Sequence, residues 1–358
     1  MANPILLAGG GTGGHVYPAL AMGDALKARG YPVHYYGDAA RLEGRVAPER
    51  GYPFRGVPAV QFPRSGIASK IKFAWSLFTS IWSTRRLLKE DGVRLVLGVG
   101  GYVMAPTVLA AWSMGIPAAI HESNVAPGLA NKLCARVAKL VLLTYAETAA
   151  KLPGSAEKIT VGCPVNPKVL TGDGARYGLR PNRPVVLVVG GSLGAATINT
   201  LAITMARDPG RTYDILHVCG PRYYDEVKAA YGDLPDGVVL VGYEDRMGDA
   251  YAVASLVIAR AGSSTLAELC AAGKPSLLIP SPNVTDNHQE ANARGLERGG
   301  AAVVVVEAGF DANAVAATVS TLLADSACLS TMSAAAKTLA QPDVAWRVAD
   351  LLEARFLK

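Results

Sequence analysis

The stretch ILLAGGGTGGHVYPAL, residues 5–20, places a glycine-rich loop between an apolar run and an alanine- and leucine-containing segment. Glycine allows the backbone to approach a phosphate or a sugar closely. A helix that follows such a loop presents its N–H groups and the positive end of its dipole to the same ligand. This stretch therefore predicts a strand, a ligand-binding loop and a helix, the opening unit of a parallel α/β sheet.

The glycines of this loop also fit the fingerprint of dinucleotide-binding folds. Gly9, Gly11 and Gly14 have the spacing G-x-G-x-x-G. Asp38 lies 24 residues after Gly14, near the position where such folds have an acid that binds ribose. An NAD(P)-dependent oxidoreductase that uses this loop is therefore the first functional hypothesis.

Strand-like and helix-like segments alternate along the whole chain. Glycine loops recur at 98–102 and 190–195, and the polar, proline-bearing stretch 163–184 divides the sequence into two similar halves. The pattern predicts two doubly wound, Rossmann-like parallel-sheet domains of the α/β class that face a cleft. The apolar runs expected to form strands are 4–9, 32–37, 94–99, 117–121, 139–144, 158–162, 184–190, 213–219, 238–242, 255–259, 275–280 and 301–306.

Composition narrows the class of partner. The net charge is +6, but residues 60–90 alone carry six basic side chains against one acidic side chain. Such local basicity favours an anionic surface over general nucleic-acid binding. The five cysteines form no C-x-x-C pair and no signal peptide is recognisable, so we expect small buried cysteines in a reducing, cytosolic compartment.

An uncharged run of 26 residues, 95–120, is long enough to cross a membrane. Its GVGG, AP and GIP sequences instead predict a strand, a glycine loop, a helix of about ten residues and a second strand. We therefore expect a soluble or peripheral protein.

The segment RAGSSTLAE, 260–268, predicts a further helix N-terminus that suits a diphosphate. Ser263 and Ser264 are candidate N-caps, and Glu268, one turn later, can accept hydrogen bonds from both hydroxyls of a ribose. The alternative for Glu268 is a solvated helix acid. The polar cluster TDNHQEANA, 285–293, favours the ribose interpretation, because its amides suit sugar hydroxyls.

Six motifs together resemble those of the MurG family of peptidoglycan glycosyltransferases. They occur in that family's order and at its spacings, over about the whole chain: GGGTGGHVYPALA, GVGGYVMAPTVLAAW, IHESNVAPGLANK, VVGGSLGA, RAGSSTLAE and DNHQEANA. The resemblance implies the two-domain GT-B fold. It also implies inverting transfer of GlcNAc from the co-substrate UDP-GlcNAc to O4 of MurNAc in lipid I (undecaprenyl-diphosphate-MurNAc-pentapeptide), which gives lipid II, with no tightly bound cofactor.

The resemblance further implies an acceptor- and membrane-facing domain over 1–163 and a UDP-GlcNAc-binding domain over 164–341. A C-terminal helix within 342–358 would return to the first domain. The protein would lie peripherally on the cytoplasmic face of the inner membrane. Its partners would be UDP-GlcNAc, lipid I, an anionic membrane surface and other cell-wall enzymes, but no nucleic acid.

Carried over by position, the resemblance assigns residues to both substrates. Asn166 stands where the family usually has an arginine near the donor, with Lys168 and Arg260 as candidates to supply the charge, and His288 stands where some members have glutamine. Tyr243 would meet the uracil edge through its backbone. The acceptor side would be lined by His15, Tyr102, Glu122 and Asn124, and donor contacts would come from Thr12, Gly13, Gly14, Asn124, Asn166, Ser192, Tyr243, Ser263, Ser264, Thr265, Leu266, Ala267, Glu268 and Gln289.

Inversion requires one general base near the acceptor hydroxyl and stabilisation of the departing UDP. His15 closes the first glycine loop, and a histidine ordinarily has a pKa of about 6.5, which suits this task. Its alternative is a structural role in the first turn of the helix. Glu122, at the end of an expected strand, is the rival base. No D-x-D motif occurs, so we expect no metal bound in that way.

Residues 71–89 predict an amphipathic helix. At about 100° per residue, one narrow stripe is apolar and largely aromatic, and Arg85, Arg86 and Lys89 lie near its end. We expect this stripe to contact an anionic bilayer, while a second arc with Leu88 faces the core. The alternative is a fully buried helix. The stripe consists of Ile71, Trp75, Phe78 and Trp82.

Two other classes of function remain open. An oxidoreductase leaves the motifs at 260–268 and 285–293 unexplained. A non-catalytic sugar-nucleotide-binding protein would keep the donor site but would need neither His15 nor Glu122.

Overall fold

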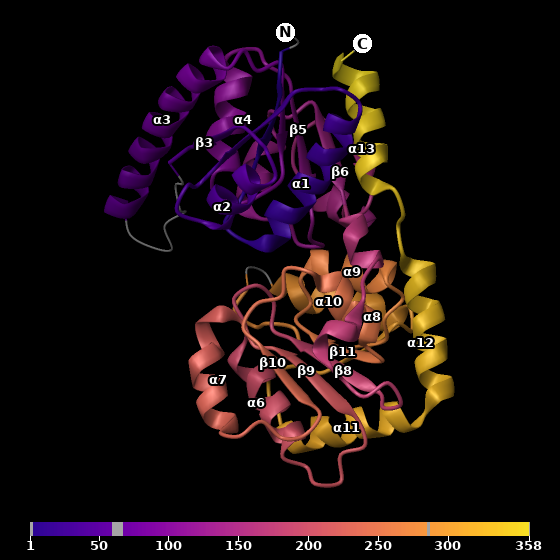
Figure 1. Cartoon of the computed structure of the whole chain (residues 1–358). Coiled ribbons are helices and arrows are strands. Elements are labelled where there is room, and N and C mark those ends of the chain that lie inside the picture. Colours follow the sequence, from indigo (N-terminus) through magenta and orange to yellow (C-terminus); the bar gives the residue numbers. More distant parts are fainter. Residues whose placement is uncertain (1–2, 59–66, 285–286, 358) are drawn as a thin grey trace. The chain divides into compact units, whose positions relative to one another are not determined.

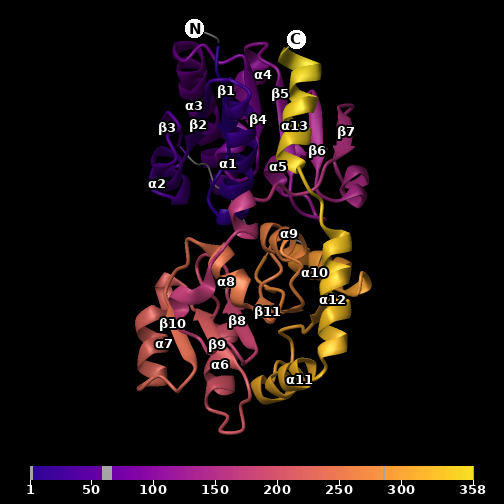
Figure 2. The ribbon, with the colours of Figure 1, turned by 45° about the vertical axis from the view of Figure 1, so that its right-hand side comes forward.

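The computed structural model describes residues 3–58, 67–284 and 287–357. Two compact units divide the chain, one formed by Met1–Val165 with Asp343–Lys358 and the other by Asn166–Pro342. Each unit is a sheet with helices packed on it (Figures 1 and 2). The C-terminal residues therefore belong to the same unit as the N-terminal ones.

The first unit contains a seven-stranded parallel sheet with the order β3-β2-β1-β4-β5-β6-β7. Because β1 lies between β2 and β4, the direction of winding reverses there, and parallel sheets bind ligands at such a point. The pairing of Ala8 with Gly98 brings the loops after β1 and β4 together. The strands are β1 Ile5–Ala8, β2 Val33–Gly37, β3 Phe54–Gly56, β4 Leu95–Gly98, β5 Ala118–Glu122, β6 Leu140–Leu143 and β7 Glu157–Thr160.

Helices cover both faces of this sheet. Alternate residues of β1 point to opposite faces, so Leu7 packs among side chains of α1 and α13 and Leu6 packs among those of α3, α4 and α5. α13 runs beside α1 in both views (Figures 1 and 2). The helices are α1 Gly13–Ala28, α2 Leu42–Glu49, α3 Ile67–Glu90, α4 Met104–Ser113, α5 Leu129–Cys134 and α13 Val344–Leu352.

The second unit repeats this plan with six parallel strands in the order β10-β9-β8-β11-β12-β13. The winding reverses between β8 and β11, where Val189 pairs with Ala259. α6 and α11 cover one face. The strands are β8 Val185–Val189, β9 Asp214–Val218, β10 Val238–Val241, β11 Leu256–Ala259, β12 Ser276–Leu278 and β13 Ala302–Val304, and the helices are α6 Ala196–Ala206, α7 Tyr224–Tyr231, α8 Met247–Val253, α9 Ser263–Ala271, α10 His288–Arg298, α11 Ala312–Ala324 and α12 Ser326–Leu339.

Every strand expected from the apolar runs is present, and the structure adds β3, which the sequence did not indicate. β3 is a three-residue edge strand without a buried residue, so it has no apolar run to mark it. The uncharged run 95–120 forms β4, a loop, α4 and β5, as predicted.

Among the described residues, no single helix is both long and apolar enough to cross a membrane. One bent pair, Ala312–Ala324 with Ser326–Leu357, meets the criterion by length and composition only.

Candidate active site

The first glycine loop, residues 9–14, is occupied by a carboxylate of the protein itself. Both carboxylate oxygens of Glu43 accept from the backbone N–H of Gly11, at 3.1 and 3.0 Å, and Oε1 also accepts from Asp38 N at 3.1 Å. Glu43 is completely buried. In a dinucleotide-binding fold this loop faces a pyrophosphate, which a buried carboxylate would repel. The oxidoreductase hypothesis for this loop is therefore wrong.

The second glycine loop locks onto the first. Gly10 N donates to Gly100 O at 3.3 Å, and a Cβ on Gly101 would collide with Gly10 O. Gly100 and Gly101 both have positive φ, +98° and +83°, which favours glycine. The imidazole of His15, in the first turn of α1, lies against Gly100, where an added Cβ would approach Nδ1 to 2.8 Å. Tyr102 follows in the same loop with an exposed side chain.

Thr12 lies at the N-cap position of α1, although its side chain makes no capping hydrogen bond. Its carbonyl accepts from the N–H groups of His15 and Val16, both at 3.1 Å. Gly13 and Gly14 are the first helical residues. The loop thus begins the helix that carries His15.

Glu122 ends β5 and is buried, with both oxygens used inside the following loop. Oε1 accepts from the backbone N–H of Asn124 at 2.9 Å and from its side-chain amide at 3.3 Å, whereas Oε2 accepts from Gly128 N at 3.1 Å and from the amide of Asn131. Burial raises the pKa of Glu122, and these hydrogen bonds oppose the rise. The carboxylate therefore holds the loop together, which weighs against its role as a base.

In the second unit, the loop 190–195 and the start of α9 follow the paired strands β8 and β11. Gly191 and Gly194 have φ of +85° and +80°, and Gly194 approaches the carbonyl of Cys219 too closely for any side chain. Ser192 is half-buried in this loop. The loop and the helix N-terminus therefore meet where the winding of the sheet reverses.

α9 begins at Ser263, within the expected range, but its N-cap differs from the prediction. Its N-cap is Gly262, so Ser263 and Ser264 are the first helical residues and not N-caps. Leu266 is buried and its N–H already donates to Gly262 O at 3.0 Å, so its expected donor contact is not supported. Thr265 and Ala267 are half-buried.

Glu268 is held by a neighbouring helix. The hydroxyl of Tyr251, a buried residue of α8, donates to Glu268 Oε2 at 2.8 Å. Burial raises the pKa of Glu268 to about 7, and the bond from Tyr251 opposes the rise. The carboxylate is thus fixed in position and ionises near neutral pH, unlike a solvated helix acid.

The side chains of the polar cluster 285–293 form one hydrogen bond at the start of α10 and others to neighbouring loops. Gln289 Oε1 accepts from Ser281 N at 2.9 Å, Asn287 donates to Glu290 at 2.6 Å, and the buried Asn292 donates to Ala261 O at 3.4 Å. Thr285 and Asp286 lie outside the described residues. Asn292 therefore holds α10 against the segment after β11, and Gln289 holds it against the segment after β12.

Asn166, which stands where the family usually has an arginine, has a local structural role. Its side chain caps the short 3-10 turn Pro167–Leu170 by accepting from Lys168 N at 3.0 Å. The guanidinium of Arg260 donates to Glu307 at 2.9 Å and to two carbonyls, which weighs against Arg260 as the source of the missing charge. Lys168 is exposed.

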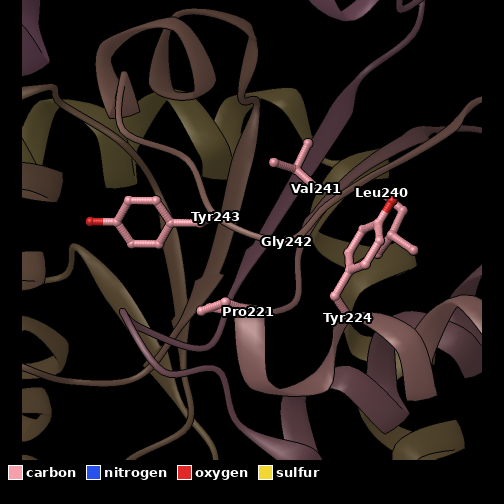
Figure 3. Close-up of a pocket in the computed structure, with 6 residues that line it drawn as sticks. All are labelled: Pro221, Tyr224, Leu240, Val241, Gly242 and Tyr243. Atoms are coloured by element: carbon pink, nitrogen blue, oxygen red, sulfur yellow. The ribbon is translucent and has the colours of Figure 1, made fainter.

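An open pocket of about 450 Å³ lies at the carboxyl ends of β9 and β10. Its size is within the range usual for small-molecule sites. In Figure 3 the ring of Tyr243 points away from Tyr224 and Leu240. The backbone at Gly242 therefore lines the pocket without being covered by this ring. The lining residues are Pro221, Tyr224, Leu240, Val241, Gly242 and Tyr243.

Among the described residues there is no group of three or more His, Cys, Asp or Glu side chains that could hold a metal ion.

Two family models match the chain, the glycosyltransferase family 28 N-terminal domain over residues 5–143 and its C-terminal domain over residues 185–348. A relative from Clavibacter sepedonicus, the UDP-N-acetylglucosamine–N-acetylmuramyl-(pentapeptide) pyrophosphoryl-undecaprenol N-acetylglucosamine transferase, is 40% identical over 360 residues, covering 97% of this chain and 95% of the relative. The chain belongs to the MurG family.

A MurG relative of the same name from Aeromonas hydrophila is 38% identical over 352 residues, covering 98% of this chain and 96% of the relative. The crystal structure of Acinetobacter baumannii MurG superposes with a TM-score of 0.77 at 29% identity, covering 99% of this chain and all of that one. The predicted fold class, two parallel-sheet domains of the GT-B type, is therefore confirmed.

Membership of the family does not by itself assign roles to individual residues of this chain. Sequence reasoning missed Glu43 and Asn131, each of which fixes a loop at the end of a strand in the first unit. Glu43 is 32 residues from Gly11, and Asn131 is nine residues from Glu122, so no local motif indicated either contact.

Proposed function

We propose that this chain is an inverting glycosyltransferase that moves GlcNAc from UDP-GlcNAc to O4 of MurNAc in lipid I. The activity named for two relatives, each matched over at least 95% of its length, carries the proposal. The fixed carboxylate of Glu268 and the pocket beside Tyr243 support it, because a nucleotide donor needs a ribose contact and a base site.

On the donor side, the uracil edge would bind the backbone at Tyr243, and the ribose hydroxyls would donate to Glu268. The diphosphate would lie at the start of α9, where the helix dipole and N–H groups favour negative charge. Ser192, Ser263 and Ser264 would add hydroxyl contacts, and Gln289 would contact the sugar. These groups would stabilise the negative charge of the departing UDP.

On the acceptor side, His15 is the better base. Its imidazole lies where two glycine loops meet, whereas both oxygens of Glu122 are already engaged by backbone and amide donors. Tyr102 and Asn124 would contact the acceptor. His15 would remove the proton from O4 as O4 forms its bond to the anomeric carbon of GlcNAc and UDP leaves. A single displacement of this kind inverts the anomeric centre.

The decisive experiment measures UDP release from UDP-GlcNAc with a lipid I analogue, together with thermal shifts. UDP and UDP-GlcNAc should raise the melting temperature, because a ligand at 100 times its Kd adds about 2.7 kcal/mol. NADH and NADPH should not. A shift with NADH and none with UDP would contradict the transferase proposal, and UDP binding without release in the presence of acceptor would favour a non-catalytic sugar-nucleotide-binding protein.

We further propose that α3 contacts an anionic membrane at the cytoplasmic face of the inner membrane. Trp75, Phe78 and Trp82 stack in sequence along the helix with centroids 6.0 and 6.5 Å apart. The stripe is exposed by 56–68%, while Leu88 on the second apolar arc is fully buried. The expected separation of the two arcs is therefore present, and the fully buried alternative is wrong. Ile71 extends the stripe.

The basic residues near the stripe differ in their availability. Arg85 donates to Ser113 Oγ at 2.7 Å and Arg86 pairs with Glu90 at 2.8 Å, so part of their charge is used within the protein. Lys89 is exposed. Arg64 lies outside the described residues. Each basic group near such a membrane contributes about 1 kcal/mol.

Replacing Trp75, Phe78 and Trp82 with serine should release the protein from anionic vesicles and leave transfer to a short-chain, water-soluble acceptor intact. Flotation at two salt concentrations measures this, since the charged part of binding is screened by salt. The matched control replaces three exposed leucines of the second unit with serine and should bind normally. Undiminished binding of the folded aromatic variant would place the membrane contact elsewhere. The control residues are Leu170, Leu234 and Leu339.

A further inference from the structure

Glu43 is a buried acid to which the proposed reaction gives no direct task. It lies in the first turn of α2, where its carboxylate reaches back to the backbone of residues 9–14. Three backbone hydrogen bonds of 3.0–3.1 Å, from two residues, end on its two oxygens. Buried carboxylates are costly without such partners, so this arrangement is maintained by the fold around it.

Two glycines make the space for this carboxylate. A Cβ on Gly10 would collide with Glu43 Oε1, and a Cβ on Gly37 would collide with the Cγ of the same side chain. Gly37 is the last residue of β2, and Gly10 lies two residues after the end of the neighbouring strand β1. The site is therefore a closed anion site, built from backbone donors and filled by the side chain of Glu43.

The same loop is fixed on its other sides. Tyr35, buried on β2, donates its hydroxyl to Gly9 O at 3.1 Å, and Gly10 N donates to Gly100 O. His15 lies four residues after Gly11, and its imidazole packs against Gly100. Glu43 thus closes the remaining side of a loop whose end carries the imidazole.

We propose that Glu43 is a positioning residue, whose carboxylate takes the place of a ligand phosphate in the first glycine loop and thereby fixes the loop that seats His15. The catalytic part of this inference rests on the proposed function. The bound carboxylate also excludes nucleotide phosphates from this loop, because two anions would share one buried site.

The first test compares Glu43→Gln with wild type in the UDP-release assay. The amide keeps the shape but replaces one acceptor oxygen with a donor that faces backbone N–H groups. kcat should fall by about 10- to 100-fold, as expected for a small displacement of a reacting group, while the Kd of UDP stays within twofold. Unchanged kcat would overturn the proposal.

Glu43→Ala gives a second test, because it empties the anion site. Added formate or acetate should restore part of kcat in this variant in a saturable manner, whereas chloride at equal ionic strength should not. Failure of both carboxylates to restore a well-folded Glu43→Ala variant, as judged by UDP binding, would overturn the proposal. Glu49→Ala is the matched control, since Glu49 lies on the same helix with its side chain 58% exposed. It should behave as wild type.

A third measurement does not depend on any transferase activity. Amide hydrogen exchange at residues 10–15 should be faster in Glu43→Gln than in wild type, and formate should slow it in Glu43→Ala. Equal exchange in wild type and Glu43→Gln would overturn the positioning role. An inactive wild-type protein with the expected exchange pattern would instead contradict the proposed function and leave the role of Glu43 in the loop supported.

Discussion

The first and third glycine loops, 9–14 and 190–195, follow equivalent strands of two similar sheets, but only the first loop binds a side-chain carboxylate among the described residues. Gly11 and Gly191 have nearly the same φ, +87° and +85°. The first loop donates to the carboxylate of Glu43. Within the described part of the second unit, no side-chain carboxylate binds the backbone of residues 190–195, and the nearby Glu307 is engaged by Thr197 and Arg260.

The comparison shows that a glycine fingerprint specifies the shape of a backbone and not its ligand. A loop that already holds an anion suits a neutral sugar hydroxyl and a histidine. A loop whose N–H groups face no internal acid, beside a helix N-terminus, suits a diphosphate. The two units can therefore use one motif for an acceptor and for a donor.

The largest effect is expected when the histidine of the first loop is removed. His15→Ala should lower kcat by about 10²–10⁴-fold, because proton transfer to a positioned base is lost, with a much smaller change in the Kd of UDP. Single-turnover kinetics and calorimetric titration of UDP measure the two effects separately.

Glu122→Gln is the companion variant. It should lower the melting temperature, because the amide cannot accept from every donor that now faces the carboxylate. If it instead abolishes turnover with stability and UDP binding intact, Glu122 is the base and the assignment of His15 is wrong.

The donor half of the comparison is tested at Glu268. Glu268→Ala should weaken UDP binding by about 1–3 kcal/mol, since ribose hydroxyls would lose their acceptor. Glu226→Ala, which removes an exposed acid from α7 of the same unit, is the control and should bind UDP normally. Equal affinities of the Glu268→Ala variant and wild type would place the ribose elsewhere.

The smallest expected effect is a pH dependence of donor binding. Because the pKa of Glu268 is raised to about 7, the free protein holds a neutral carboxyl at pH 6 and a carboxylate at pH 8. Ribose hydroxyls donate better to the carboxylate, so the Kd of UDP-GlcNAc should fall as pH rises, by up to about tenfold. Titration calorimetry at pH 6, 7 and 8 measures this trend, and Glu268→Gln should remove it.

The sequence predicted the strands, the glycine loops and the amphipathic α3 because each has a local signal. Apolar runs marked the buried strands, and helical spacing marked the aromatic stripe of α3. The structure confirms that this stripe is exposed and that Leu88, on the second arc, is buried. β3 escaped because an exposed three-residue edge strand has no such run. The roles of the site residues stay predictions.

The residues that sequence reasoning missed act through distant partners. Glu43 binds a loop 32 residues earlier, and in the sequence it is an ordinary acid in a helix. The hydrogen bond from Tyr251 to Glu268 joins two helices of unrelated sequence. The N-cap of α9 is set by the backbone conformation of Gly262. Because Ser263 and Ser264 are common N-cap residues, the sequence favoured them instead.

The contact of α13 with α1 has a consequence for how the protein is made. Val348 and Leu352 are fully buried in the same core as Leu7 of β1. The core of the first unit therefore cannot be completed until residues 343–358 have left the ribosome, which happens after the second unit has been made. Expression of residues 1–165 alone would leave that apolar surface uncovered, whereas joining residues 343–358 to its end would restore the missing layer.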